Sequence, residues 1–136
     1  MGKELAPIVS ARLGKLLLEL GGNNAAIVCP SANLDLTIKG IAFSACGTTG
    51  QRCTSLRRLF VQNEIYDDCV NRLEKCFEDL IIGCPTKKDS QIGPLISKES
   101  YDSMQKILTS LRNKGVKVLG GERLEIESPD EYYVKP

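Results

Sequence analysis

Short apolar runs alternate along this chain with longer segments whose apolar residues recur at helical spacing, and this alternation restricts the possible folds. A run that is apolar at every position suits a buried strand, whereas recurrence every three to four residues produces one apolar helix face. The strand-like runs lie at 16–18, 25–29, 59–61, 116–119 and 132–134, and the helical segments at 7–15, 34–46, 65–80 and 97–111. This order indicates an α/β fold with a mainly parallel sheet flanked by helices.

Polar residues at the expected helix starts support these boundaries, because their side chains can accept hydrogen bonds from the first free N–H groups. Asn63 and Ser97 are the expected caps of the third and fourth helices, and either Ser31 or Asn33 can cap the second. Pro7 is expected to begin the first helix, since proline is tolerated in a first turn but not in a helix interior.

Composition and charge exclude several classes of function. The formal net charge of +1 argues against broad electrostatic binding to nucleic acid. No apolar run approaches the roughly 20 residues that a membrane-spanning helix needs, so no membrane role is expected. The first residues do not resemble a secretion signal, which predicts a cytoplasmic protein. The six cysteines are irregularly spaced and the chain has no histidine, so reduced thiols and no metal site are expected.

Cys53 follows a turn-forming glycine in the sequence Gly-Gln-Arg-Cys-Thr at 50–54 and is the candidate nucleophile. Without histidine, the thiol would have to be activated by a carboxylate, a lysine, a dipole or a bound cofactor. Glu19 lies 34 positions upstream, in Leu-Glu-Leu-Gly-Gly at 18–22, and is the candidate general base. It interrupts an apolar run, and burial there would raise its pKa towards the useful range. A packed cysteine and a solvated acid are the simpler alternatives.

These two motifs resemble the nucleophile and general-base signatures of the aldehyde dehydrogenases, in the family's order and at the separation that its pattern expects. The resemblance extends over essentially the whole chain. The amino-acid sequence at 20–25, 57–61 and 92–95 is most similar to that of the antiquitin branch. It implies that Cys53 attacks an aldehyde to give a thiohemiacetal and then a thioester. Glu19 would activate the water that hydrolyses this thioester.

The same resemblance implies NAD as cofactor, with Leu20 and Gly21 bordering the nicotinamide. It also implies that Arg52 binds the carboxylate of a substrate that carries an amino-acid head group, for which the planar guanidinium is suited. The implied substrate is α-aminoadipic semialdehyde, oxidised to α-aminoadipate in lysine breakdown. A simple turn at Gly21 and Gly22, and a surface charge at Arg52, are the alternatives.

The family pattern assigns residues 1–18 to the end of a cofactor-binding domain and 19–136 to an incomplete N-terminal part of the catalytic domain. We therefore expect a fragment that is inactive alone, because most of the cofactor site and a second oxyanion donor lie upstream in the family. The full-length enzyme is expected to be a homo-oligomer, a tetramer, in the cytoplasm or in mitochondria. The alternatives are a non-catalytic α/β module for oligomer contacts or regulation, and a thioesterase that needs no cofactor.

Overall fold

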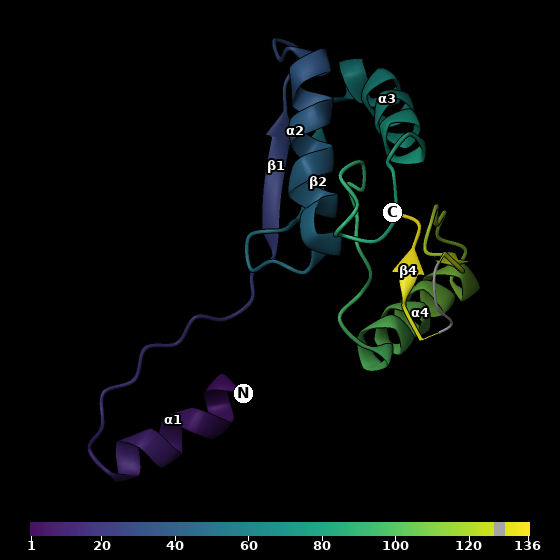
Figure 1. Cartoon of the computed structure of the whole chain (residues 1–136). Coiled ribbons are helices and arrows are strands. Elements are labelled where there is room, and N and C mark those ends of the chain that lie inside the picture. Colours follow the sequence, from purple (N-terminus) through teal and green to yellow (C-terminus); the bar gives the residue numbers. More distant parts are fainter. Residues whose placement is uncertain (127–129) are drawn as a thin grey trace.

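The computed structural model describes residues 1–126 and 130–136, which form helices and two small sheets, with the first helix set apart from both sheets (Figure 1). The elements follow in the order α1 (Gly2–Ala11), β1 (Asn24–Val28), α2 (Leu34–Cys46), η1 (Gly47–Gly50), β2 (Leu56–Val61), η2 (Asn63–Ile65), α3 (Tyr66–Glu78), α4 (Lys98–Asn113), β3 (Arg123–Leu124) and β4 (Tyr133–Val134), where η marks a short 3-10 helix.

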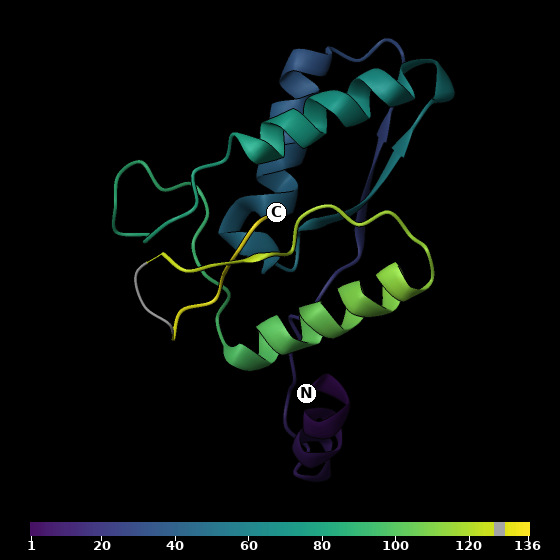
Figure 2. The ribbon, with the colours of Figure 1, turned by 90° about the vertical axis from the view of Figure 1, so that its right-hand side faces the viewer.

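Strands β1 and β2 pair in parallel, and α2 is the crossover that parallel strands require. The register joins Val28 to Val61 and contains one irregularity, between Asn24 and Ala25. Helix α2 packs against β2 and α3 packs against α2, so both helices lie on the same side of the strand pair (Figures 1 and 2). The predicted α/β class with a parallel sheet is therefore confirmed.

The main core lies between this strand pair and its two helices. Ile38, Ile41 and Ala42 are buried and lie at helical spacing on one face of α2. Val28 of β1 is 2% exposed and Cys69 of α3 is fully buried. The apolar periodicity of α2 therefore corresponds to a face that the fold buries. Burial of this face is the main source of stability for a helix of this length.

Two of the expected helix caps are confirmed and one is wrong. The side chain of Asn33 accepts a hydrogen bond from the N–H of Leu36 at 3.2 Å. Ser97 caps α4 by accepting from the N–H of Ser100 at 3.2 Å. Asn63 instead begins the 3-10 turn η2, and α3 starts three residues later at Tyr66. A polar residue near a helix start thus identified the region but not the capping position.

The C-terminal elements form a second group, in which α4 lies beside the short antiparallel pair of β3 and β4 (Figures 1 and 2). Several hydrogen bonds join the loop before α4 to its surroundings, among them those from the N–H of Ile92 to the carbonyl of Ile81 (3.1 Å) and from that of Leu95 to the carbonyl of Tyr132 (2.9 Å). Tyr133 is fully buried, so the predicted strand over 132–134 is confirmed as β4.

The predicted buried strand over 16–18 is wrong. These residues belong to an extended segment that joins α1 to β1 and lies apart from the β1–β2 pair in both views (Figures 1 and 2). Leu17 is 86% exposed, while Leu18 and Leu20 lie beside Gly2 of α1. An apolar run becomes a strand only where a partner strand and a face to cover are available, and this segment has neither along 16–18.

Two further expectations differ from the structure. Residues 116–119 form no strand and are largely exposed, with Leu119 58% exposed. Helix α1 begins at Gly2 rather than at Pro7, so the proline lies inside the helix, where it lacks the N–H that would bond to the preceding turn. In the part of the chain that the structure describes, none of the helices combines the length and apolarity needed to cross a bilayer.

Candidate active site

Cys53 lies in a turn between the C-terminus of α2 and the start of β2. The turn begins with left-handed backbone at Thr48 (φ 55°), Thr49 (φ 56°) and Gly50 (φ 67°). Glycine adopts such angles freely, whereas a β-branched residue adopts them at a conformational cost. This reversal leaves the Cys53 side chain exposed to solvent at the end of the helix.

The structure brings the two sequence motifs together through the main chain around Cys53. The side-chain amide of Asn24 donates to the carbonyl oxygens of both Cys53 (2.9 Å) and Ser55 (3.1 Å). Gly22 lies so close to Cys53 that a Cβ atom on the glycine would overlap the Cys53 carbonyl oxygen. The second glycine of the first motif therefore contacts the backbone of the second motif.

Ser55 closes the turn from the inside and is 2% exposed. Its hydroxyl oxygen accepts from the N–H of Arg52 at 3.0 Å, and its own N–H donates to the Arg52 carbonyl at 3.2 Å. Sequence reasoning missed both Ser55 and Asn24. The available signal was a polar residue just before each apolar run, and for Ser55, which is buried, such a residue needs a hydrogen-bond partner.

Glu19 lies on the extended segment and is exposed, so its expected burial in a strand is wrong for this chain. It precedes Gly22 by three residues, and an extended chain spans at most about 3.6 Å per residue. Its main chain is therefore within about 11 Å of the glycine that touches Cys53. In the part of the chain that the structure describes, no hydrogen bond or ion pair joins the Glu19 carboxylate to Cys53, so the two motifs meet through Gly22 and Asn24 alone.

Leu20 and Gly21 form an open apolar surface next to this contact. Leu20 is 54% exposed, and a Cβ atom placed on Gly21 would meet nothing within 4 Å. Bare backbone beside an exposed leucine suits the close approach of a flat ring. Contact of these two residues with a nicotinamide stays a prediction.

Arg52 is half-buried, and its side chain folds back onto the end of α2. Its guanidinium carbon lies 4.8 Å from the centre of the Phe43 ring, and its Nε donates to the hydroxyl of Thr48 at 3.0 Å. The guanidinium also covers Gly47, where any side chain would collide with it. The cation is thus held over an aromatic face at the base of the turn.

The other thiols differ from Cys53 in their surroundings. Burial, together with nearby Cys76, raises the pKa of Cys46 to about 11. Burial and the Asp68 carboxylate also raise the pKa of Cys69. Cys46 and Cys69 are buried, whereas Cys29 is exposed like Cys53. Among residues 1–126 and 130–136, no three histidine, cysteine or acidic side chains gather closely enough to hold a metal ion.

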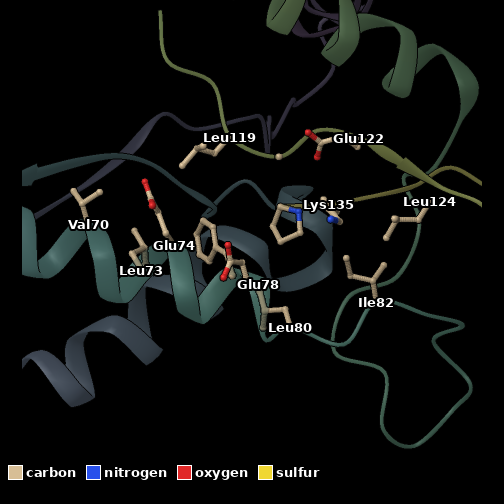
Figure 3. Close-up of a pocket in the computed structure, with 13 residues that line it drawn as sticks. Val70, Leu73, Glu74, Glu78, Leu80, Ile82, Leu119, Glu122, Leu124 and Lys135 are labelled. Carbon is tan, nitrogen blue, oxygen red and sulfur yellow. The ribbon is translucent and has the colours of Figure 1, made fainter.

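A separate apolar groove of about 730 Å³ lies between α3 and the segment 119–124 (Figure 3). Leu73, Leu119 and Leu124 are among its lining side chains, with Glu74 and Lys135 at its polar positions. Its lining includes none of the five predicted site residues. The groove reflects the amphipathic face of α3, whereas the candidate nucleophile lies in the turn that follows α2.

The whole chain, residues 1–136, matches the aldehyde dehydrogenase family. It is 38% identical over 136 residues to aldehyde dehydrogenase family 7 member A1 of Malus domestica, covering 100% of this chain and 26% of that protein. It is also 38% identical over 132 residues to the α-aminoadipic semialdehyde dehydrogenase of Bos taurus, covering 97% of this chain and 24% of that protein. The chain thus spans about a quarter of the length of the curated relatives it matches.

Solved structures of the same family have the same arrangement. The NAD⁺ complex of an aldehyde dehydrogenase from Bacillus cereus superposes with a TM-score of 0.89 at 29% identity, covering 99% of this chain and 27% of that one. An NAD-dependent aldehyde dehydrogenase from Sinorhizobium meliloti gives 0.89 at 32% identity, covering 97% of this chain and 26% of that one.

Proposed function

The chain belongs to the aldehyde dehydrogenase family, and we propose that the protein containing it oxidises an aldehyde to a carboxylic acid with NAD through a thioester on Cys53. The observation that carries this proposal is the contact of Gly22 and Asn24 with the Cys53 carbonyl. That contact brings the segment bearing Glu19 to the segment bearing an exposed thiol. No other described pair of motifs combines a candidate nucleophile with a candidate base in this way.

Residues of this chain are assigned to the attack on the aldehyde and to the hydrolysis of the thioester. The Cys53 thiolate attacks the aldehyde carbon, and the Cys53 N–H donates to the resulting oxyanion. NAD, when bound, supplies the hydride acceptor that oxidises this adduct to a thioester. Glu19 then takes a proton from a water molecule as the water oxygen attacks the thioester carbon, and the carbon–sulfur bond breaks to release the carboxylic acid and the Cys53 thiolate, with the proton left on Glu19.

Leu20 and Gly21 are the residues of this chain that would border the nicotinamide. An exposed leucine and an uncovered stretch of backbone exclude water from one face of a flat ring without competing for hydrogen bonds. The phosphate and ribose groups would be held by residues outside this chain, in the cofactor-binding domain to which we assign residues 1–18.

We propose a substrate with an amino-acid head group, α-aminoadipic semialdehyde, as in the antiquitin branch. The named mammalian relative at 38% identity supports this choice. Arg52 adjoins the nucleophile and is held by Phe43 and Thr48, so its guanidinium is pre-oriented for a carboxylate. A tetramer, in the cytoplasm or in mitochondria, is proposed from the family alone.

The test uses a full-length protein that contains this chain, with Cys53→Ser as the key variant. The wild type should reduce NAD only when an aldehyde is present, and Cys53→Ser should abolish this activity, whereas Cys29→Ser, which also replaces an exposed thiol, should retain it. Reduction of NAD that survives Cys53→Ser would refute the proposal. Hydrolysis of an added thioester without NAD turnover would favour a thioesterase, and neither activity would favour a non-catalytic module.

A further inference from the structure

We propose that Gln51 is a positioning residue for Cys53, because its side-chain amide fastens the nucleophile turn to the loop over 93–96. We refer to these contacts, together with the one made by Thr49, as the loop clasp. The inference rests on the proposed function, in which Cys53 is the nucleophile. Gln51 itself touches neither substrate nor cofactor in this proposal.

Both ends of the Gln51 amide take part in the loop clasp. Its oxygen accepts from the N–H of Ile96 at 2.8 Å, and its nitrogen donates to the carbonyl oxygens of Thr48 (3.1 Å) and Pro94 (3.4 Å). Thr49 adds a hydrogen bond from its hydroxyl to the Gly93 carbonyl at 2.8 Å. Because one end must accept and the other must donate, only glutamine or asparagine chemistry suits these partners, and asparagine is one methylene shorter.

The loop to which the turn is fastened is itself fixed to the framework. Ile92 is 4% exposed and forms a bridge with Ile82, and Leu95 forms a bridge with Tyr132. Tyr132 precedes the fully buried Tyr133. The loop clasp therefore connects the turn to buried residues of both groups of elements, and a connection of this kind can hold a site more firmly than a free loop.

The turn requires such support because of its backbone. Thr48 and Thr49 have positive φ angles of 55° and 56°, which β-branched residues adopt only when surrounding contacts over-determine them. The loop clasp contacts both of these residues, through the Thr48 carbonyl and the Thr49 hydroxyl. Without Gln51 the turn can relax towards an ordinary conformation and carry Cys53, two positions further on, out of place.

Displacement of a nucleophile affects the chemical step more than binding. A misplacement of about 1 Å can reduce a rate on the order of a hundredfold, because reacting atoms must meet in a near-attack geometry. Loss of the loop clasp should therefore lower kcat and leave KM nearly unchanged. A merely structural role would lower the amount of folded enzyme without this split.

The first measurement is amide hydrogen exchange in the chain, comparing Gln51→Ala with Gln91→Ala. Gln91 is a matched control, because its side-chain oxygen accepts the same kind of hydrogen bond, from the N–H of Ile81 at 2.8 Å. In Gln51→Ala, exchange at Ile96 and over 50–55 should accelerate at least about tenfold, since local opening sets the exchange rate. Gln91→Ala should not change exchange over 50–55.

The second measurement is the rate of the NADH burst in a full-length enzyme that contains this chain. Gln51→Ala should slow the burst by about tenfold or more with KM changed less than about threefold. Thr49→Val removes one hydroxyl at nearly constant volume and should slow the burst less than Gln51→Ala does. This second variant keeps the proposal testable if Gln51→Ala does not fold. Failure of the proposed function would appear separately, as a wild type without aldehyde oxidation. Unchanged exchange over 50–55 in Gln51→Ala would overturn the proposed positioning role of Gln51. An equal slowing of the burst in Gln91→Ala would overturn it as well.

Discussion

Gly22 lies directly against the main-chain carbonyl of Cys53, so that a Cβ atom at position 22 would overlap the carbonyl oxygen. The neighbouring Gly21 faces open space. The two glycines of one motif therefore have different functions in the structure. One permits contact between two chain segments, and the other leaves a surface uncovered.

Replacing Gly22 with alanine should destabilise the chain, because the obstacle is a backbone atom that cannot rotate away. The expected loss in the free energy of unfolding is about 1–3 kcal/mol, the usual effect of overpacking. Gly21→Ala has space for its methyl group and should change stability by less than about 0.5 kcal/mol. Urea unfolding of the two variants measures the difference, and similar losses would mean that the two segments separate in solution.

Replacing Asn24 with alanine should loosen the turn around Cys53. The variant loses hydrogen bonds to the carbonyl oxygens of Cys53 and Ser55, each of which contributes about 0.5–1.5 kcal/mol. Since Asn24 is exposed, we expect a total loss of about 1 kcal/mol in unfolding free energy. The matched control is Asn23→Ala, which preserves the main-chain carbonyl that accepts from Arg58. An equal loss in both variants would refute a specific role for the Asn24 amide.

The thiols should differ in alkylation by iodoacetamide, because only the thiolate reacts. At pH 8 the exposed Cys53 should be labelled before Cys46, which has a pKa of about 11, and before the buried Cys69. Labelling of Cys46 should increase as the pH rises towards 11, because its neutral thiol persists until then. Mass mapping after brief exposure measures the order, with exposed Cys29 as the reference. Early labelling of Cys69 would contradict the packing of α3.

In a full-length enzyme that contains this chain, Glu19→Gln should impair hydrolysis of the thioester more than its formation. Only the second half-reaction requires an activated water molecule, so a rapid NADH burst should remain while steady turnover falls by about 10²–10⁴-fold. Stopped-flow measurements distinguish the two phases. Glu64→Gln, a change at another exposed carboxylate, should affect neither phase. Equal loss of burst and turnover would mean that Glu19 does not act only as the general base of thioester hydrolysis.

In the same enzyme, Arg52→Ala should weaken binding of a semialdehyde that carries a carboxylate. A charge-assisted pair contributes roughly 1.5–3 kcal/mol, so KM should rise about tenfold to a hundredfold for this substrate and little for a simple alkyl aldehyde. Arg57→Ala, on the neighbouring strand, serves as the control. If both substrates were affected equally, the contacts of Arg52 with Phe43 and Thr48 would serve only to shape the turn.

The sequence by itself determined helices α2 and α4 of this protein and the identity of its candidate nucleophile and base. Helical periodicity and capping act between residues three or four positions apart, so α2 and α4, with caps Asn33 and Ser97, could be predicted from local pattern alone. The two motifs around Glu19 and Cys53 could likewise be read from residue order and separation. These features depend on neighbours along the chain.

The tertiary structure decided which apolar runs became strands and which residues support the site. The runs at 16–18 and 25–29 look alike in sequence, but only the second pairs with β2, because a strand needs a partner that local pattern cannot supply. The contacts of Asn24 with Cys53 and of Gln51 with Ile96 join residues 29 and 45 positions apart. Only the folded chain brings such distant groups within hydrogen-bonding distance.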